Sequence, residues 1–173
     1  YSVVAYKTAY LKANYPAEFI AANLTNEINS VDKLPVYIAE GRRMGLEIDP
    51  PDINRSDKVF DVVDGRIVYG LLGIKNLGES AADEIIRERQ KNGPFKSYME
   101  FLDRVDLHSV NRKAMEVLIK TGCFDKIEPN RNRLLINFEA AIEYAESKKE
   151  STRYGQASLF EDTDIQEFVE FKY

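Results

Sequence analysis

The stretch Gly73-Ile74-Lys75-Asn76-Leu77-Gly78 decides how this 173-residue chain is interpreted, because a helix-like run begins directly after it at Glu79. Its two glycines enclose a polar pair between two apolar residues, a spacing that favours a compact hairpin opening into a helix. The first amides of a helix have no internal partner and carry the positive end of the helix dipole, so they can bind phosphate. Lys75 would add a mobile charge. A helix-entry loop that binds nothing is the alternative.

A second unit of the same plan follows, with a short helix, a tight turn and a longer helix. Ser97 can cap the short helix, and Asn111 can cap a helix over residues 112–121. Arg112 and Lys113 lie in the first turn of that helix, where cations oppose the dipole unless an anion or solvent compensates them. Two such units side by side would contact phosphates on both DNA strands, with salt-sensitive, sequence-independent affinity. The predicted DNA-binding residues are therefore Gly73, Ile74, Lys75, Asn76, Leu77, Gly78, Ser80, Asn111, Arg112 and Lys113.

The first third of the chain is predicted to be helical, over residues 3–14, from Pro16 onward, and from a cap at Ser30 to a left-handed stop at Gly45. Apolar stripes run along the first and third of these helices. Because helix burial requires such stripes, we interpret them as core rather than as ligand sites. The stripe residues are Val3, Tyr6, Tyr10 and Leu11 in the first helix, and Val31, Leu34 and Ile38 in the third.

A small β-hairpin is predicted next, because Asp64-Gly65 separates two apolar strands at residues 59–63 and 66–69. Asp49-Pro50-Pro51-Asp52 before it is a stiff connection, and we place a module boundary nearby. The aspartates in this region lie on turns and strand edges without converging, so we interpret them as solvated rather than as a metal site. They occupy positions 49, 52, 57, 61 and 64.

The last predicted helix covers residues 131–147, and a polar segment follows it. Beyond that segment an apolar pair stands behind a polar residue, a pattern that suits a short peptide docking into a partner's pocket. Folding of this pair back onto the parent core is the alternative. The residues of the peptide are Gln156, Ala157, Ser158, Leu159 and Phe160.

Composition indicates a globular protein, with 44% apolar and 31% charged residues. One cysteine, Cys123, excludes an internal disulfide, and one histidine leaves no zinc set, so we expect a reducing cytoplasm. No apolar run is long enough to span a membrane. The net charge of -5 is uneven: residues 66–133 hold 13 Lys and Arg against 10 Asp and Glu, and both flanking segments are acidic. The missing initiator methionine indicates an excised fragment.

Several motifs, in order along nearly the whole chain, resemble the C-family of bacterial replicative polymerases, the DNA polymerase III alpha subunits. They are Tyr6-Lys7-Thr8-Ala9-Tyr10-Leu11-Lys12, Tyr15-Pro16-Ala17-Glu18-Phe19, Pro50-Pro51-Asp52-Ile53-Asn54, Tyr69-Gly70-Leu71, Gly73-Ile74-Lys75, Asn111-Arg112 and Gln156-Ala157-Ser158-Leu159-Phe160. One departure is Asn76, where the family commonly has glycine. Asparagine tolerates left-handed backbone angles, so the hairpin should survive.

The resemblance implies a mainly α fold with a small β-hairpin. Residues 1–65 would end the fingers region, and residues 66–150 would form a tandem helix-hairpin-helix module that grips duplex DNA. Residues 151–173 would be a flexible segment that carries the sliding-clamp peptide at 156–160 and begins a further domain. The family's catalytic carboxylates, and the Mg²⁺ they use, lie upstream, so we expect no catalytic residue, cofactor or metal in this chain.

The resemblance thus implies a non-catalytic part of a replicative polymerase. Its expected partners are duplex DNA, the sliding clamp and the remaining polymerase domains and holoenzyme, without any membrane. The alternative is an interaction scaffold whose helix-hairpin-helix units pack inside the polymerase and never reach DNA. A free-standing nuclease or glycosylase would need a catalytic Asp, Lys or metal set, and the sequence offers none that we can assemble.

Overall fold

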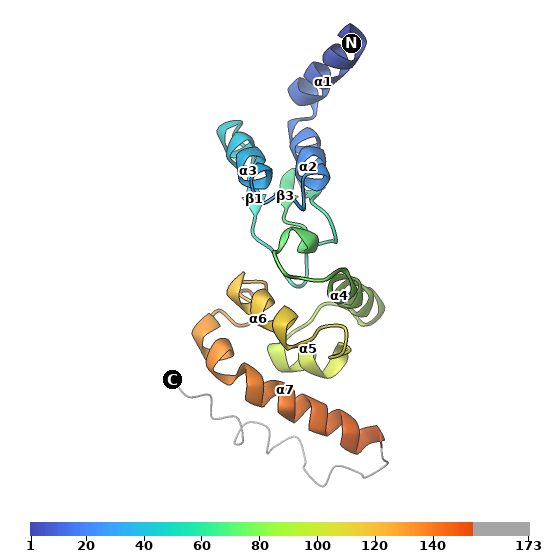
Figure 1. Ribbon diagram of the computed structural model, residues 1–173, viewed down its shortest axis with the longest axis vertical. Coiled ribbons are helices and arrows are strands. Elements are labelled where there is room, and N and C mark those ends of the chain that lie inside the picture. Colours follow the sequence, from blue (N-terminus) through green and yellow to red (C-terminus); the bar gives the residue numbers. More distant parts are fainter. Residues whose placement is uncertain (154–173) are drawn as a thin grey trace.

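The computed structural model describes residues 1–153, which form a mainly helical structure with one small sheet, as predicted. Figure 1 shows an elongated arrangement with α1 at one end and α7 across the other. No helix within residues 1–153 combines the length and apolar character needed to cross a membrane. The elements are α1 (Ser2–Asn14), α2 (Pro16–Asn26), α3 (Lys33–Arg43), β1 (Ile48–Asp49), β2 (Asp61–Val63), β3 (Arg66–Val68), the 3-10 turn η1 (Leu71–Gly73), α4 (Glu79–Asn92), α5 (Tyr98–Arg104), α6 (Arg112–Lys120) and α7 (Arg131–Arg153).

Two apolar cores hold the structure together. The smaller core joins α2, α3 and the sheet around Ile20, Leu24 and Ile67. The larger core joins η1 to α7 and is built on Leu71, Phe101 and other buried side chains of the helical half. Tyr69 packs against both cores, so the segment that leads from β3 into η1 connects them.

The sheet contains the predicted hairpin and one strand that the sequence analysis missed. Asp64 and Gly65 form the turn with φ angles of 53° and 75°, and β2 pairs antiparallel with β3. Because both turn residues need positive φ, the Asp-Gly pair suits this tight turn. The additional strand, β1, pairs in parallel with β3 through Ile48 and Ile67. Its two-residue length explains why no strand pattern was visible in the sequence.

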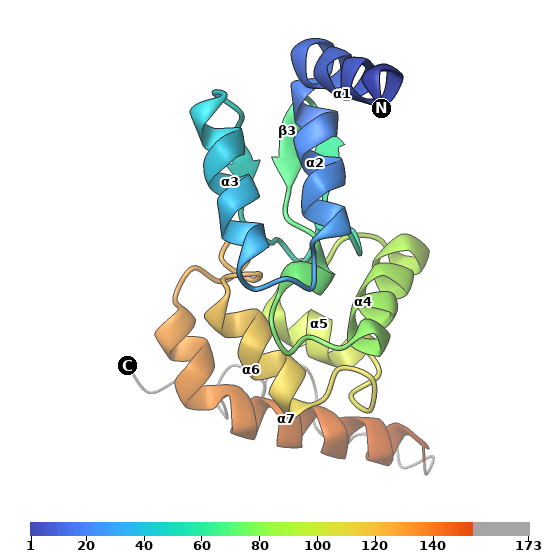
Figure 2. The same ribbon diagram turned by 45° about the horizontal axis from the view of Figure 1, so that its top comes forward.

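The prediction that the stripe on α1 is core is wrong for the described chain. The helix itself forms where expected, but none of its residues is buried. Tyr6 remains 69% exposed and Tyr10 49% exposed, because α1 extends away from the two cores (Figure 2). It packs against α2, and Lys12 near its end pairs with Glu40 of α3 at 2.6 Å. Val31, assigned to the α3 stripe, is also exposed, whereas Leu34 of the same stripe is buried.

The connection after β1 is a strap that ties the sheet to the helical half. Asn54 pairs with the backbone of Phe95 in both directions, donating from Nδ2 to O and accepting at Oδ1 from N, each at 2.8 Å. The Ile53 amide also donates to the carbonyl of Cys123 at 2.9 Å. Double pairing of a side-chain amide with backbone satisfies polar groups that burial would otherwise leave unbonded.

Asp49, at the end of β1, and Asp52, in the strap, correct the interpretation of the aspartates as solvated. Asp49 is 9% exposed and accepts hydrogen bonds from Arg55 and Arg66. Asp52 is 6% exposed, and its Oδ2 lies 2.8 Å from Nζ of Lys126. Buried carboxylates require such partners, because an unpaired charge away from water is costly.

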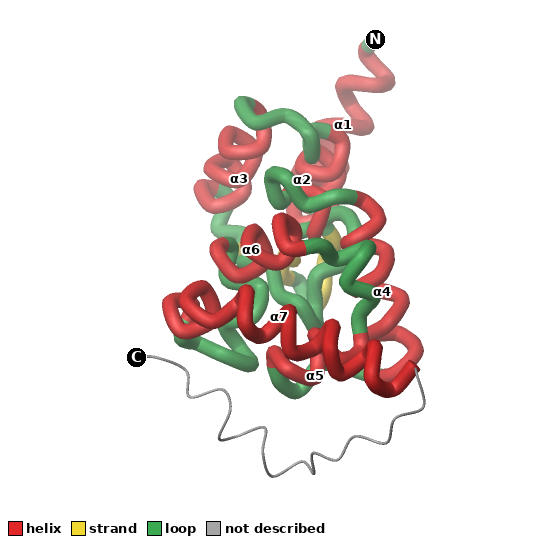
Figure 3. Tube along the Cα trace, turned by 60° about the horizontal axis from the view of Figure 1, so that its bottom comes forward, coloured by secondary structure: helices red, strands yellow, loops and turns green. Residues whose placement is uncertain are grey.

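Helix α7 follows the predicted apolar face but continues to Arg153, six residues beyond the predicted end. Leu134, Ala141, Ile142 and Ala145 are buried on that face. Figures 2 and 3 show α7 lying across α5 and α6, so that it covers one side of the second helical unit. The polar residues after Ser147 therefore belong to the helix as far as Arg153.

Candidate nucleic-acid interface

Hairpin 1, residues 73–78, forms the compact loop that the sequence predicts. The amide of Ile74 donates to the carbonyl of Leu71 at 3.0 Å, and the amide of Leu77 donates to the carbonyl of Ile74 at 3.1 Å. Asn76 adopts a left-handed φ of 69°, confirming that asparagine can replace glycine there. These local bonds turn the chain directly into α4.

The side chains of hairpin 1 divide into anchors and exposed groups. Ile74 and Leu77 are buried in the larger core, so only their backbone atoms can reach a ligand. Lys75 and Asn76 are exposed at the tip, as are Gly78 and Ser80 at the entry to α4. The buried anchors hold the loop in place, and the exposed groups are free to contact a partner.

Tyr69 orients hairpin 1, a role that the sequence analysis missed. Its hydroxyl donates to the carbonyl of Gly73 at 3.2 Å, and its ring packs against Phe60 with centroids 4.6 Å apart. A Cβ on Gly73 would lie 2.8 Å from the Tyr69 ring, so only glycine permits this approach. Partial burial raises the pKa of Tyr69. In the sequence, Tyr69 only ends a predicted strand, and nothing in that pattern predicts its contact with Gly73.

The amino terminus of α4 is open, unlike those of α5 and α6. Gly78 is its N-cap residue and has no side chain to accept from the first amides. Ser97 caps α5 by accepting from the amide of Glu100, and Asn111 caps α6 by accepting from the amide of Ala114. Within the described part of the chain no side chain caps α4, so its first amides are available to an external acceptor.

Lys58 pairs with two acidic side chains beside this open helix end. Its Nζ lies 2.6 Å from Oε1 of Glu79 and 2.9 Å from Oδ1 of Asp83. The hydrogen bond to Glu79 is the main cause that raises the pKa of Lys58. One cation thus offsets part of the negative charge of these two carboxylates at the edge of the predicted phosphate site.

Hairpin 2, residues 105–111, connects α5 to α6 and lies beside α4. The buried Glu84 of α4 accepts a hydrogen bond from the amide of Asp106 at 2.9 Å. Arg104, at the end of α5, donates to Glu88 of α4 and stacks over Phe95. The two units are therefore joined through α4. Sequence patterns did not predict the burial of Glu84, because a carboxylate on a helix is usually solvent-facing.

At the start of α6, carboxylates of the protein itself compensate Arg112, one of the two predicted cations. Arg112 is paired with Glu139 of α7, and its guanidinium also lies 3.9 Å from Glu143 and 3.5 Å from Glu146. Lys113 is exposed. The sequence analysis expected either an anion or solvent to compensate the cations at this helix start. At Arg112 the structure shows the anion, which α7 supplies.

The peptide at residues 156–160 lies outside the described residues. The two hairpins are therefore the candidate site within residues 1–153. Residues 45–134, from before β1 into the first turn of α7, match the family of the helix-hairpin-helix motif. The chain belongs to the helix-hairpin-helix family.

This helix-hairpin-helix chain is also similar along its length to polymerase subunits. It is 53% identical over all 173 residues to the DNA polymerase III subunit alpha of Treponema pallidum, and 49% identical over 170 residues to that of Borreliella burgdorferi. The subunit of Thermus aquaticus is 42% identical over 170 residues. The chain spans only 15%, 15% and 14% of these relatives, respectively. The resemblance to DNA polymerase III alpha subunits is therefore confirmed.

Proposed function

We propose that residues 66–150 bind duplex DNA through its backbone phosphates, as a non-catalytic part of a replicative DNA polymerase. The observation that carries this proposal is the open amino terminus of α4, which leaves its first amides for an external acceptor. Lys75 stands exposed beside it on a hairpin that two buried side chains anchor. Backbone amides and a lysine read charge rather than base identity, so the binding is independent of sequence.

In this proposal, residues 1–65 belong to the fingers region and the helical half supports the product duplex in the cytoplasm. The polymerase activity itself resides in parts of the relatives that this chain does not span. The similarity to DNA polymerase III alpha subunits supports this division of roles. Hairpin 2 would add a second phosphate contact through Lys113 and the α6 amides that Asn111 leaves unbonded.

Exchanging Lys75 for glutamate is expected to weaken binding to a blunt DNA duplex about tenfold at low salt, because one attractive phosphate contact becomes repulsive. The logarithmic salt slope should also fall by about one. Fluorescence anisotropy at several salt concentrations measures both quantities. Lys91→Glu, an equal charge change at the far end of α4, is the control and should have a smaller effect. Equal affinities for Lys75→Glu and wild type would contradict the proposal.

A scaffold that never touches DNA is the second candidate, and the ion pairs of Arg112 favour it. They commit one predicted phosphate ligand to α7. In this case hairpin 2 would stabilise packing inside the polymerase. This candidate requires that Lys75→Glu leave the duplex affinity unchanged.

We also propose that residues 156–160 tether the polymerase to the sliding clamp. The polar residue followed by an adjacent leucine and phenylalanine, together with the similarity of the whole chain to polymerase subunits, supports this role. Tethering to a ring on DNA would turn repeated rebinding into an effectively intramolecular event.

The double substitution Leu159→Ala, Phe160→Ala is expected to weaken clamp binding at least a hundredfold, because paired apolar anchors supply most of the energy of such peptides. Calorimetric titration of the chain with its cognate clamp measures this loss. The double variant Ile165→Ala, Val169→Ala removes similar apolar surface outside the peptide and should bind normally. Unchanged clamp affinity in the first variant would refute the tether.

A further inference from the structure

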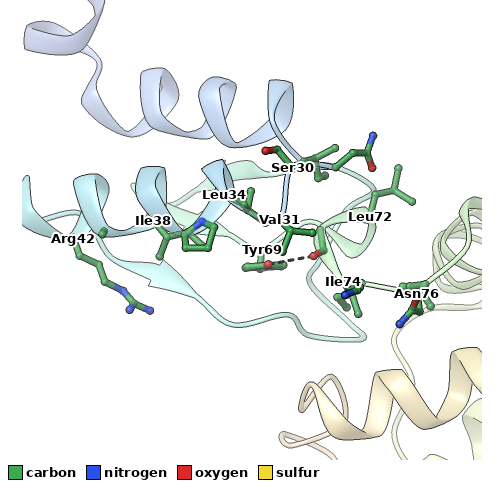
Figure 4. A pocket seen from close by; sticks show the side chains of 16 residues that line it. Ser30, Val31, Leu34, Ile38, Arg42, Tyr69, Leu72, Ile74 and Asn76 are labelled. Carbon is green, nitrogen blue, oxygen red and sulfur yellow. Dashed lines mark hydrogen bonds between the residues drawn. The ribbon is translucent and has the colours of Figure 1, made fainter.

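A groove of about 670 Å³ runs between α3 and hairpin 1. Leu34 and Ile38 of α3 form one wall, and Leu72 and Ile74 form the other. Figure 4 shows Ser30 and Asn76 near one end of the groove and Arg42 at the other. The groove is therefore an apolar channel with polar ends.

The charge of this groove is one-sided. Among residues 1–153, Arg42 and Lys75 are the only charged residues that line it, and none of the described carboxylates does, although the chain as a whole carries a net charge of -5. Within residues 1–153, neither cation forms an ion pair with a carboxylate. Asn29 and Asn76 add amide groups at the rim. Such a surface is complementary to an anionic ligand that also has apolar faces.

The groove is continuous with hairpin 1. Residues 73–77 of the hairpin line it, so a strand held at the hairpin would pass directly into it. Between the walls lies Tyr69, whose hydroxyl holds the Gly73 carbonyl and whose ring offers an aromatic surface (Figure 4). Positively charged grooves with apolar and aromatic surfaces are the usual means of binding unpaired nucleotides.

We propose that this groove binds a single-stranded stretch of DNA that continues from the duplex held at hairpin 1. The bases of a duplex are stacked and paired, so the apolar walls would find no partner on it, whereas unpaired bases can pack against them. The volume suits a few nucleotides rather than a double helix. Arg42 then contacts a phosphate at the far end of the groove. The inference rests on the proposed duplex binding at hairpin 1.

The test compares a blunt duplex with the same duplex carrying a single-stranded extension of about six nucleotides, on each end in turn. The wild-type chain should bind one extended form about tenfold more tightly than the blunt form, because packing one base contributes roughly that factor. Arg42→Glu should abolish this gain and leave blunt-duplex affinity unchanged. Arg43→Glu is the matched control, because Arg43 is the exposed neighbour that does not line the groove.

Val31→Asp provides an independent variant, since Val31 lines the groove yet is 68% exposed, so folding should be unaffected. Val31→Asp should also remove the tighter binding of the extended duplex, because it places a carboxylate against the phosphates of the single-stranded DNA. Equal wild-type affinity for blunt and extended duplexes would overturn the inference, and this is the pattern expected if a protein segment fills the groove. A gain that survives Arg42→Glu, or is lost equally in Arg43→Glu, would overturn it too. If the proposed duplex binding at hairpin 1 is wrong, a different result shows it: the affinity for the blunt duplex is then the same for Lys75→Glu and wild type.

Discussion

Replacing Gly70 by alanine should destabilise the protein by about 3 kcal/mol, at the upper end of the usual cost of overpacking. A Cβ at this position would lie 2.5 Å from the carbonyl carbon of Val59 and 2.7 Å from the amide nitrogen of Phe60. Both are backbone atoms, so no side chain can rotate away. The next amide, that of Leu71, donates to the carbonyl of Asp57 at 2.9 Å, which holds the two segments at this spacing.

Urea unfolding followed by circular dichroism measures this loss. Gly78→Ala is the matched control, because its φ of -76° suits any residue and the nearest atom to an added Cβ is Oγ of Ser80 at 3.8 Å. Its free energy of unfolding should remain within about 0.5 kcal/mol of wild type. If Gly70→Ala were as stable as Gly78→Ala, the backbone of Gly70 would not lie as close to Val59 and Phe60 as the structure shows. The position of η1 and hairpin 1 would then be wrong.

Replacing Phe101 by alanine should lower the free energy of unfolding by about 4 kcal/mol, the middle of the range for truncating a buried phenylalanine. The Phe101 side chain is 0% exposed. Its ring makes edge contacts with Phe95 and Phe124, with centroids 4.8 Å and 5.0 Å away. The substitution removes these contacts and leaves a cavity at the centre of the larger core. The same urea titration measures the effect.

Tyr6→Ala is the comparison for Phe101→Ala, because the aromatic stripe of α1 was predicted to be core. Tyr6 is 69% exposed, so its removal should change the free energy of unfolding by less than about 0.5 kcal/mol. A loss near that of Phe101→Ala would mean that α1 packs against the rest of the chain in solution. A small loss for Phe101→Ala would contradict the position of the larger core.

The elements that sequence analysis predicted well are those set by neighbouring residues. Asn111 caps α6 by accepting a hydrogen bond from the amide three residues later. Gly45 ends the helical conformation after α3 with a left-handed φ of 79°. The Asp64-Gly65 turn depends in the same way on backbone angles of two residues. Hairpin 1 belongs to this class, since its hydrogen bonds join residues three apart.

The roles of several charged residues were outside the reach of sequence patterns. Arg112 pairs with Glu139, 27 residues away, and Asp49 receives Arg66 from 17 residues away. Glu84 is buried only because hairpin 2 brings the amide of Asp106 to it, from 22 residues away. A helical wheel or a strand pattern compares only neighbouring positions, so it cannot predict pairs between residues this far apart in the sequence.

The sequence by itself determined the helices, the β-turn, the caps of α5 and α6 and the shape of hairpin 1, because bonds within about four residues and allowed backbone angles decide them. It also determined the resemblance to polymerase subunits. Only the tertiary structure decided which apolar faces are buried: the stripe of α7 meets α5 and α6, whereas that of α1 has no partner within residues 1–153. It also decided that Arg112 is held by carboxylates of α7, because pairing and burial depend on elements that the chain brings together from a distance.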